Sequence, residues 1–553
     1  MEALKGSYIP YQSMPVHKVK LLYHLCLENI ILNADFWLQV KKVQEKDRNT
    51  SGPFDDLPAS IEQDLLDAYE RLDSGPGRKN MWLERQDRWR LFVTQRVNRL
   101  SVTDRTEKCS LAHIAATCKN VKYLEVKNVH DVIPYLKALA PCLSTVVSLN
   151  FETMAHVNSA VLKYIRSHCP NLRVLGLRSC FLNDKAVGHL KHINSLTELD
   201  LRDTEVTAAG VCRVLKHNPQ LCSLQHPDVV RALYKMHATT AKTWLVRAVA
   251  VSYRLHDVEL ELSRKDGPEM LAVVAEVCPA VERVRVEFDV RASPQSLAPL
   301  ARLQRLAELD IQCVGDDRQS EPMTLFRGSI VPILEARGQC LLTMSLEGVA
   351  DVDMRLIEVY CPRLVSLGLY YNSYIQDSFH IPKDISSVKP FPALRRLLFG
   401  SNSGNNDFPS AYLEWLLANK DLEELCLSGS PLFTNELFSG AFANSCAFPH
   451  LRRLELDYCN ISQEVITDFL CHCGRKSLKE LSICGPFVHE QATPALCYII
   501  CKRLDVQLEA YFYSFVKMKK RMVRYKQDLN FINSKACLRS FEDCDVHKTS
   551  EPI

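Results

Sequence analysis

The sequence predicts an α/β solenoid, a fold in which short parallel strands and returning helices or turns stack in many similar units. Three observations predict it: apolar residues recur as L-x-x-L-x-L, the copies follow one another along most of the chain, and several copies begin with Cys-Pro. In each copy, alternate side chains of a short strand point inward. Stacking then buries apolar faces that a single unit leaves exposed.

The clearest copies of the pattern are "NLRVLGLRSC", "SLTELDLRDT", "RLAELDIQ", "RLVSLGLYY", "DLEELCLSGS", "HLRRLELDYC" and "SLKELSICG". Weaker copies are "NVKYLEVKN", "VVSLNFE", "AVERVRVEF" and "ALRRLLFGS". Together they indicate about fourteen units from Val121 to Ile483 at intervals of roughly 23 to 35 residues, the range of leucine-rich repeats or slightly above it. The sequence therefore predicts a leucine-rich-repeat solenoid, or horseshoe, over residues 111–490.

The repeat cysteines are a second feature of these units. Cys169 precedes one strand, and Cys180 and Cys459 follow strands. Such units resemble the cysteine-containing subclass of leucine-rich repeats found in ubiquitin-ligase receptors. A cysteine is small and weakly polar and packs well inside a turn, so we expect a structural role. "CHCG" (471–474) lacks a second Cys or His pair at zinc spacing, and we expect no metal site.

Composition and charge restrict the function classes. The chain has 553 residues, 47% of them hydrophobic, and a formal net charge of +3. A charge so close to balance favours neither a nucleic-acid nor a membrane partner. The N-terminus has no apolar core of signal-peptide length, and "WLVRAVAVSYRL" is interrupted by Arg247 and Arg254. We expect a cytoplasmic or nuclear protein with reduced thiols.

Residues 1–110 have helical periodicity and no repeat copies. In "LLYHLCLENII" (21–31), Leu22, Cys26 and Ile30 fall at i, i+4 and i+8, with Leu25 beside them, so they share one helical stripe. A helix that caps the first repeat explains this stripe.

A second interpretation comes from the order of the motifs. L-x-x-x-C-x-x-x-hydrophobe resembles the elongin-C-binding BC box, and "LPASIEQDLL" (57–66) resembles a cullin-2 box. Pro58 is suited to a first helical turn, and Ile61 and Leu65 lie one turn apart. Together the two boxes resemble a VHL box, and the layout resembles the zyg-eleven and zer-one receptors without their armadillo repeats.

The resemblance implies a non-catalytic substrate receptor of an elongin-BC, cullin-2 and RING-box ubiquitin ligase. It implies that Leu22, Leu25, Cys26 and Ile30 bind elongin C, which pairs with elongin B. It also implies that Leu57, Pro58, Ile61 and Leu65 bind the cullin.

Two alternatives remain open. An F-box would begin near the same Leu-Pro, use Trp82 or Trp89 as its late tryptophan, and bind a Skp1-type adaptor of cullin-1. A leucine-rich-repeat scaffold without ligase function would use the N-terminal helices only as a cap.

The sequence contains no Walker loop, G-x-G-x-x-G, H-E-x-x-H or G-x-S-x-G motif, so we expect neither an enzyme nor a cofactor. Target binding is expected on the strand face that alternates with the buried leucines. An acidic stripe is predicted there, interrupted by Arg283 and Arg285, and a basic segment or a free N-terminus would fit it. An ordinary charged surface is the alternative. The candidate residues are Glu198, Asp200, Asp257, Glu259, Glu261, Glu308, Asp310, Tyr370 and Tyr371.

The remaining segments complete the expected organisation. Residues 314–328 and 370–391 read as inserted loops, residues 491–535 as a C-terminal helical cap, and residues 536–553 as a disordered tail. The basic stretch "KMKKRMVRYK" (517–526) is expected to be a solvated helix face.

Overall fold

The structure is a computed structural model. It describes residues 26, 27, 29–44, 54, 57–73, 91–103, 108–152, 157–241, 252–262, 267–289, 292–314, 325–375, 390–400, 408–417, 419–429, 433–442, 448–457, 459, 461, 462, 465, 478 and 480–484. The described residues belong to two compact units. The first runs up to Leu149 and includes His168–Asn171, and the second contains Asn150–Ser167 and the residues from Leu172 onward. This division lies within the repeats.

The first unit combines N-terminal helices with the first repeats. Its helices are α2 (Ala34–Gln44), α3 (Ala59–Asp73), α5 (Lys108–Thr117), α6 (Ile133–Ala138) and α7 (Ala140–Leu143). Strands β1 (Arg99–Thr103) and β2 (Tyr123–Lys127) pair in parallel, with Leu100 opposite Leu124. Strand β3 (Ser148–Glu152) lies at the division between the units. The sequence pattern did not identify β1, because "RLSVT" carries only two apolar residues of the motif.

The second unit is built on parallel strands taken in chain order. The first three are β4 (Val174–Gly176), β5 (Glu198–Asp200) and β6 (Ser223–Gln225), which pair in parallel. A nine-stranded sheet follows, with β7 at one edge and β15 at the other. Its strands are β7 (Asp257–Leu262), β8 (Arg283–Asp289), β9 (Glu308–Val314), β10 (Thr343–Glu347), β11 (Ser366–Tyr370), β12 (Arg396–Gly400), β13 (Glu424–Ser428), β14 (Arg453–Asp457) and β15 (Glu480–Cys484).

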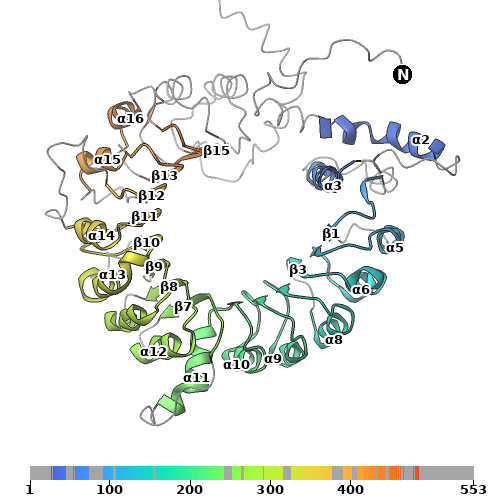
Figure 1. The fold of residues 1–553 in the computed structure, drawn as a ribbon, viewed down its shortest axis with the longest axis horizontal. Coiled ribbons are helices and arrows are strands. Elements are labelled where there is room, and N and C mark those ends of the chain that lie inside the picture. Colours follow the sequence, from blue (N-terminus) through green and yellow to red (C-terminus); the bar gives the residue numbers. More distant parts are fainter. Residues whose placement is uncertain are drawn as a thin grey trace, which may run out of the picture. The chain divides into compact units, whose positions relative to one another are not determined.

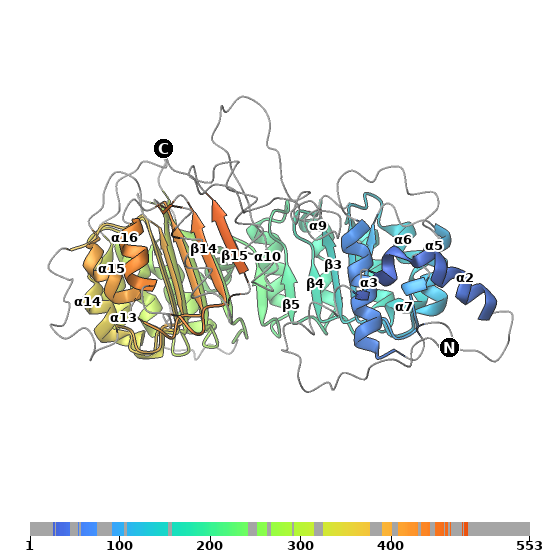
Figure 2. The ribbon, with the colours of Figure 1, turned by 90° about the horizontal axis from the view of Figure 1, so that it is seen from above.

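Helices or short helical turns lie between most of the described strands. They are α8 (Ser159–His168), α9 (Asp184–Val187), α10 (Ala208–His217), α11 (Val229–Ala241), α12 (Pro268–Val277), α13 (Val331–Arg337), α14 (Met354–Tyr360), α15 (Ser410–Leu417) and α16 (Asn435–Phe442). Short helical turns are η2 (Leu190–His192), η3 (Pro294–Arg302), η4 (Phe326–Ile330) and η5 (Gly338–Cys340). Helices α12–α16 all lie on one face of the nine-stranded sheet, and no helix of the described residues lies on its opposite face (Figure 1). Figure 2 shows neighbouring strands such as β14 and β15 side by side.

The core lies between this sheet and its helices. Strand side chains alternate between buried and accessible positions, as in β10, where Met344 and Leu346 are buried and their neighbours are not. The helices contribute Leu334, Ile357 and Leu413 to the same core. Burying a large apolar side chain stabilises a fold by roughly 1.5–3 kcal/mol, so the repeated leucines supply the main driving force for stacking.

The repeat cysteines are structural, as predicted. Cys169, Cys278 and Cys361 lie at equivalent points shortly before strands β4, β8 and β11, and all three are buried. Burial raises the pKa of each thiol to about 12, so each stays a neutral thiol at neutral pH. Cys459, which follows β14, is also buried, and its Sγ lies 3.4 Å from the carbonyl oxygen of Leu427. Residues 471–474 lie outside the described residues.

A left-handed residue follows several strands and turns the chain toward the next helix. Asn128, Gly348, Tyr371 and Gly429 each come directly after a strand and have φ between 54° and 67°. Asn and Gly adopt this conformation readily, whereas an aromatic residue rarely does. Tyr371 is therefore held in a strained conformation, with its amide donating to the carbonyl oxygen of Gly400 at 3.0 Å.

The prediction of an α/β leucine-rich-repeat solenoid is confirmed. Strands β2–β15 fall where about fourteen units are expected. Of the expected loops, residues 315–324 and 376–389 lie outside the described residues, as do the segments 491–535 and 536–553. The end of the first expected loop is helical instead, because Phe326, which is buried, begins η4.

Candidate protein-interaction surfaces

The described part of the BC-box-like segment is helical and amphipathic. Leu27, Ile31 and Ala34 are buried, and they are spaced so that they share one helical face. Cys26 is exposed and Ile30 is partly exposed. The fold therefore uses a different face from the one that carries Cys26. Leu22 and Leu25 lie outside the described residues.

The opposite side of this segment exposes large apolar side chains. Leu32 is 67% exposed and Phe36 is 58% exposed, and the two lie one helical turn apart. Cys26 and Asn29 precede them at three-residue intervals and are also exposed. Cys26, Leu32 and Phe36 are hereafter called the N-terminal apolar face. The stripe predicted from sequence does not include Leu32 or Phe36, because these two residues are out of step with the four-residue spacing of Leu22, Cys26 and Ile30.

An aromatic cluster fixes this segment in the first unit. The ring of Trp37 lies 5.5 Å from Phe54, which stacks on Phe92 at 6.0 Å between ring centroids. Tyr69 of α3 packs on Phe92 at 5.2 Å. Rings at these distances and tilts stabilise one another beyond their burial alone. The apolar face is thus presented by a helix whose other side is packed.

The cullin-box-like residues divide into accessible and buried positions. Pro58 is exposed at the start of α3, where its carbonyl oxygen accepts from the amide of Ile61 at 2.9 Å. Leu57 and Ile61 are partly exposed. Leu65 is 1% exposed, so it belongs to the core and is out of reach of a partner that docks on the surface.

Helix α3 also caps the edge of β1. The side chain of Gln63 imitates a neighbouring strand, because its Oε1 accepts from the Arg99 amide and its Nε2 donates to the Arg99 carbonyl, both at 3.0 Å. Glu62 is buried, accepts from the Thr94 hydroxyl, and lies 3.2 Å from the Arg96 guanidinium. The two Gln63 contacts satisfy backbone groups that an edge strand leaves unpaired. The capping residues Glu62 and Gln63 are therefore distinct from the residues that the resemblance predicted for the cullin. Trp82 and Trp89, the F-box candidates, lie outside the described residues.

The predicted acidic stripe is largely neutralised by arginine. The parallel register of β7, β8 and β9 places Arg283 between Asp257 and Glu308, hereafter the first row. It likewise places Arg285 between Glu259 and Asp310, the second row. Arg283 bonds to Asp257, and Arg285 Nε lies 2.8 Å from Asp310 and its Nη1 3.9 Å from Glu259. Four of the predicted acids thus face cations on the same sheet.

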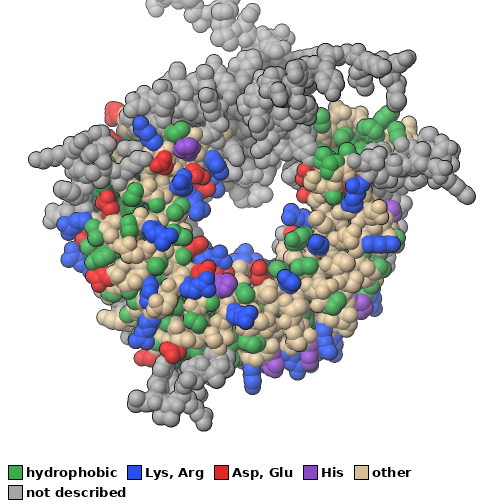
Figure 3. All heavy atoms as spheres, in the orientation of Figure 1, with side chains coloured by type: hydrophobic (Ala, Val, Ile, Leu, Met, Phe, Trp, Pro, Cys, Tyr) green, Lys and Arg blue, Asp and Glu red, His purple; other side chains and the backbone are tan. Residues whose placement is uncertain are grey.

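A third row contains acids that make no ion pair among the described residues. The register aligns Glu261, Glu287, Gln312, Glu347 and Tyr370 on β7–β11. Among the described residues, none of these three carboxylates makes an ion pair within 4 Å. Figure 3 shows acidic and basic side chains gathered together along the margin near β7–β9. Glu287 and Glu347 were not predicted, although their alternate positions in "RVRVEF" and "TMSLEG" mark them as outward residues.

The third row is electrostatically strained. Burial raises the pKa of the Glu287 carboxyl, and the negative charges of Glu261 and Glu259 raise it further. Burial also raises the pKa of Glu347, and Asp310 adds to the shift while Gln312 opposes it. Neighbouring strands are about 4.8 Å apart, so like charges aligned across them repel. A cation placed on this row would relieve that repulsion.

The other predicted face residues have different surroundings. Glu198 is exposed, whereas Asp200 makes an ion pair with Arg202 at 2.7 Å. Tyr370 ends the third row, and burial raises the pKa of its hydroxyl to about 12. Tyr371 is 39% exposed, with its ring 6.5 Å from that of Tyr370. Both tyrosines therefore lie at one end of the acidic row.

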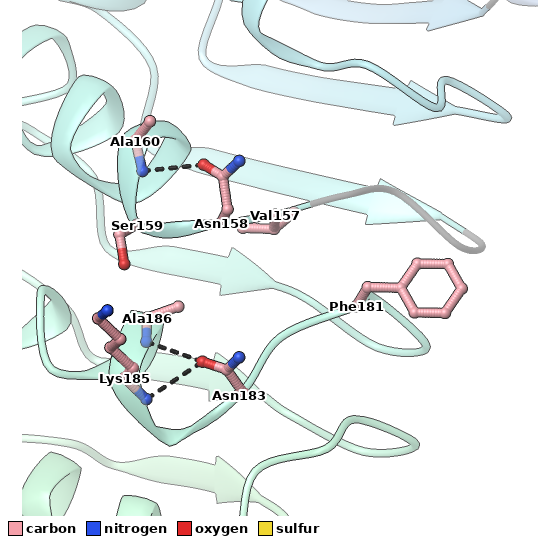
Figure 4. A pocket seen from close by; sticks show the side chains of 8 residues that line it. All are labelled: Val157, Asn158, Ser159, Ala160, Phe181, Asn183, Lys185 and Ala186. Atoms are coloured by element: carbon pink, nitrogen blue, oxygen red, sulfur yellow. Dashed lines mark hydrogen bonds between the residues drawn. The ribbon is translucent and has the colours of Figure 1, made fainter.

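A small pocket lies beside the starts of two helices. It has a volume of about 260 Å³ and is lined by Asn158 and Asn183, whose side chains cap α8 and α9, together with Phe181 and Lys185 (Figure 4). The Asn158 Oδ1 accepts from the Ala160 amide at 2.9 Å. The two asparagines are therefore engaged by their own helices.

The described residues contain no group of three or more His, Cys, Asp or Glu placed to hold a metal ion. Within that same part of the chain, no helix is long and apolar enough to cross a membrane.

The sequence matches no protein-family model and no curated protein. Solved structures give weak similarities. An internalin from Listeria monocytogenes is 12% identical, with 68% of this chain and 83% of that chain covered and a TM-score of 0.30. A leucine-rich-repeat protein from Leptospira interrogans is 14% identical, with coverage of 75% and 95% and a TM-score of 0.33.

A chain in the yeast Rad7 and Elc1 complex is also 14% identical, with coverage of 91% and 98% and a TM-score of 0.38. Similarities at this level identify neither a partner nor an activity for this chain.

Proposed function

We propose that this chain is the substrate-recognition subunit of a ubiquitin ligase built on elongin B and C, cullin-2 and a RING-box protein. One observation carries the proposal: the helical segment of the BC-box-like motif buries Leu27 and Ile31 in its own unit and leaves Leu32 and Phe36 on the surface. Two large apolar side chains exposed one turn apart on a helix favour a partner-binding surface. Exposed apolar residues that serve no partner are usually scattered singly over the surface.

The adaptor-binding surface would combine the N-terminal apolar face with Ile30 and the residues that precede it. Leu22 and Leu25 keep their predicted role at elongin C, beside Cys26. For the cullin, the accessible residues are Leu57, Pro58 and Ile61. Leu65 would act indirectly, by holding α3 in place.

The strand face would hold the target, with the third row and the tyrosines beside it. A lysine- or arginine-rich segment fits this surface. The first two rows already contain their own cations, whereas the third row does not. The chain would break or form no bond itself. It would raise the rate of ubiquitin transfer by keeping the target near the conjugating enzyme.

The adaptor half of the proposal is tested by co-purification from cells. Wild-type protein should recover elongin B, elongin C and cullin-2, and the double variant Leu32→Asp/Phe36→Asp should lose at least about tenfold of that recovery. Val359→Asp is the matched control, because Val359 is 61% exposed on α14, far along the chain from the motif. Circular dichroism would verify that both variants remain folded.

The outcomes separate the alternatives. Recovery of Skp1 with cullin-1 would identify an F-box receptor, and recovery of neither set would leave a scaffold whose helices only cap the repeats. Equal recovery of the ligase subunits by wild type and the Leu32/Phe36 variant would show that the N-terminal apolar face does not bind the adaptor.

The target half is tested with a labelled lysine-rich peptide. The triple variant Glu261→Gln/Glu287→Gln/Glu347→Gln should bind it about tenfold more weakly than wild type, since three exposed charge pairs are lost. The control changes three exposed helix glutamates, Glu269, Glu276 and Glu436, to glutamine. Equal weakening in both variants would mean that net charge, and not the third row, attracts the peptide.

A further inference from the structure

A basic surface is carried by helices in three consecutive repeats of the second unit. Lys191 in η2 and Lys216 in α10 lie seven residues before β5 and β6, and Arg166 in α8 lies eight residues before β4. All three side chains are exposed. The exposed residues Lys163, His192 and His217 extend this set. These six residues are hereafter called the basic patch, and Figure 3 shows basic and histidine side chains along the corresponding outer edge.

The basic patch contains no compensating carboxylates of its own. Helices α8, η2 and α10 have no Asp or Glu in their sequences. The nearby Asp184 on α9 is already used, because its Oδ2 accepts from the Thr207 hydroxyl at 2.7 Å and lies 3.7 Å from Arg213. Among the described residues, no carboxylate lies within ion-pair distance of Lys163, Arg166, Lys191 or Lys216.

The histidines register the same positive field. Partial desolvation lowers the pKa of His189, and the charges of Lys163, Lys191 and Arg166 lower it further. Desolvation also lowers the pKa of His192, and the charges of Arg166 and Lys191 lower it further. Side chains of α8 and η2 therefore lie near enough to interact, and the cations of neighbouring repeats form one surface.

Helix-dipole stabilisation accounts for only part of this surface. Cations in the last turn of a helix are favourable, and Arg166, Lys216 and His217 are so placed. Lys163 lies mid-helix, and η2 is a single short turn with almost no dipole. At the corresponding point before β8 the residue is Glu276, so the series of cations does not continue in that repeat.

The spacing of the patch fits an extended acidic chain. Packed helices lie about 8–10 Å apart, so the cations of consecutive repeats are expected at steps of that size. An extended polypeptide advances roughly 10 Å in three residues. Single-stranded nucleic acids are usually held by exposed aromatic rings beside the cations, and the helices α8, η2 and α10 present no exposed aromatic side chain.

We propose that the basic patch of α8, η2 and α10 is a docking surface for an extended acidic protein segment, with carboxylates at about every third residue. This surface is separate from the acidic third row and does not depend on the ligase proposal.

The test is fluorescence anisotropy on the full chain with a labelled peptide that has glutamate at every third position. The variant Lys163→Gln/Lys191→Gln/Lys216→Gln should bind it about tenfold more weakly, because three exposed ion pairs are removed. The matched control is Lys119→Gln/Lys137→Gln/Lys420→Gln, which removes the same charge from exposed lysines outside the patch and should bind like wild type. Thermal melting should be the same for all three proteins.

Two further probes decide the class of ligand. A single-stranded RNA of equal charge and vesicles with anionic lipids should bind more weakly than the peptide. Tighter binding of either one to wild type, or equal weakening of peptide binding in the two variants, would overturn the proposal. A peptide with the same glutamates in one block should also bind more weakly, and equal binding would refute the three-residue spacing.

Discussion

Two parts of the same strand face differ in how their charges are balanced. In the first and second rows, an arginine of β8 lies between acids of β7 and β9, as Arg285 does between Glu259 and Asp310. In the third row, β8 contributes Glu287 beside Glu261, with no arginine between acids. The comparison teaches that an outward acid is available to a ligand only where its cross-strand neighbours leave it without a cation.

The largest expected effect concerns the layer beneath the rows. Ile311 is completely buried between the outward residues Asp310 and Gln312 of β9. Ile311→Ala should lower the free energy of unfolding by about 2–5 kcal/mol, since it leaves a cavity in the core. Urea denaturation measures the change. Gln312→Ala should cost less than about 0.5 kcal/mol, and a larger cost would mean that the third row is structural.

Arg285→Ala should have the next largest effect. It removes two ion pairs and leaves Glu259, Asp310 and Glu287 facing one another, so we expect a loss of about 1 kcal/mol after allowance for solvent screening. Arg305→Ala is the control, because it removes a single pair with Glu282 at 2.8 Å. Equal losses from both variants, measured by urea denaturation, would contradict the electrostatic difference between the rows.

Glu287→Gln should change stability in the opposite direction. The substitution removes repulsion from Glu261, which lies directly opposite, and should raise the free energy of unfolding by about 0.5 kcal/mol. Added salt should reduce the gain by screening the charges. Glu276→Gln on α12 should leave stability unchanged. A destabilised Glu287→Gln protein would show that this carboxylate has a stabilising partner.

The smallest expected effect is a dependence on pH. The pKa values of Glu287 and Glu347 are raised by burial and by neighbouring negative charge, so the folded state holds these protons more tightly than the unfolded state. Their favourable contribution is present at low pH and is lost as pH rises through the folded pKa. The double variant Glu287→Gln/Glu347→Gln should therefore exceed wild type in stability at neutral pH, and the difference should shrink on acidification. A constant difference across pH would contradict the raised pKa values.

Much of the strand face was predictable from sequence, but its chemistry was not. Alternation in "DVELEL" and "RVRVEF" correctly identified which side chains point outward. The same alternation predicted Asp257, Glu259, Glu308 and Asp310 as target-binding acids, but these four residues face arginines. Pairing depends on the register between strands that are about 25 residues apart in sequence, and a one-dimensional pattern does not contain it.

The N-terminal segment was predictable to a similar degree. Helical spacing identified an amphipathic stripe that contains Cys26 and Ile30, but the buried side is formed by Leu27, Ile31 and Ala34. Both stripes are present in the sequence, and only burial in the folded unit, where Trp37 of the same segment contacts Phe54, selects between them. The roles at elongin C and cullin-2 stay predictions.

The sequence by itself determined the repeat, the outward alternation and the inert cysteines, because each depends on local spacing and on burial that every unit repeats. Tertiary structure decided which charges are neutralised, which apolar helix face is left exposed, and that lysines from three separate repeats form one basic patch. Those properties depend on which residues from distant units become neighbours. Stacking brings them together, and no local pattern records the outcome.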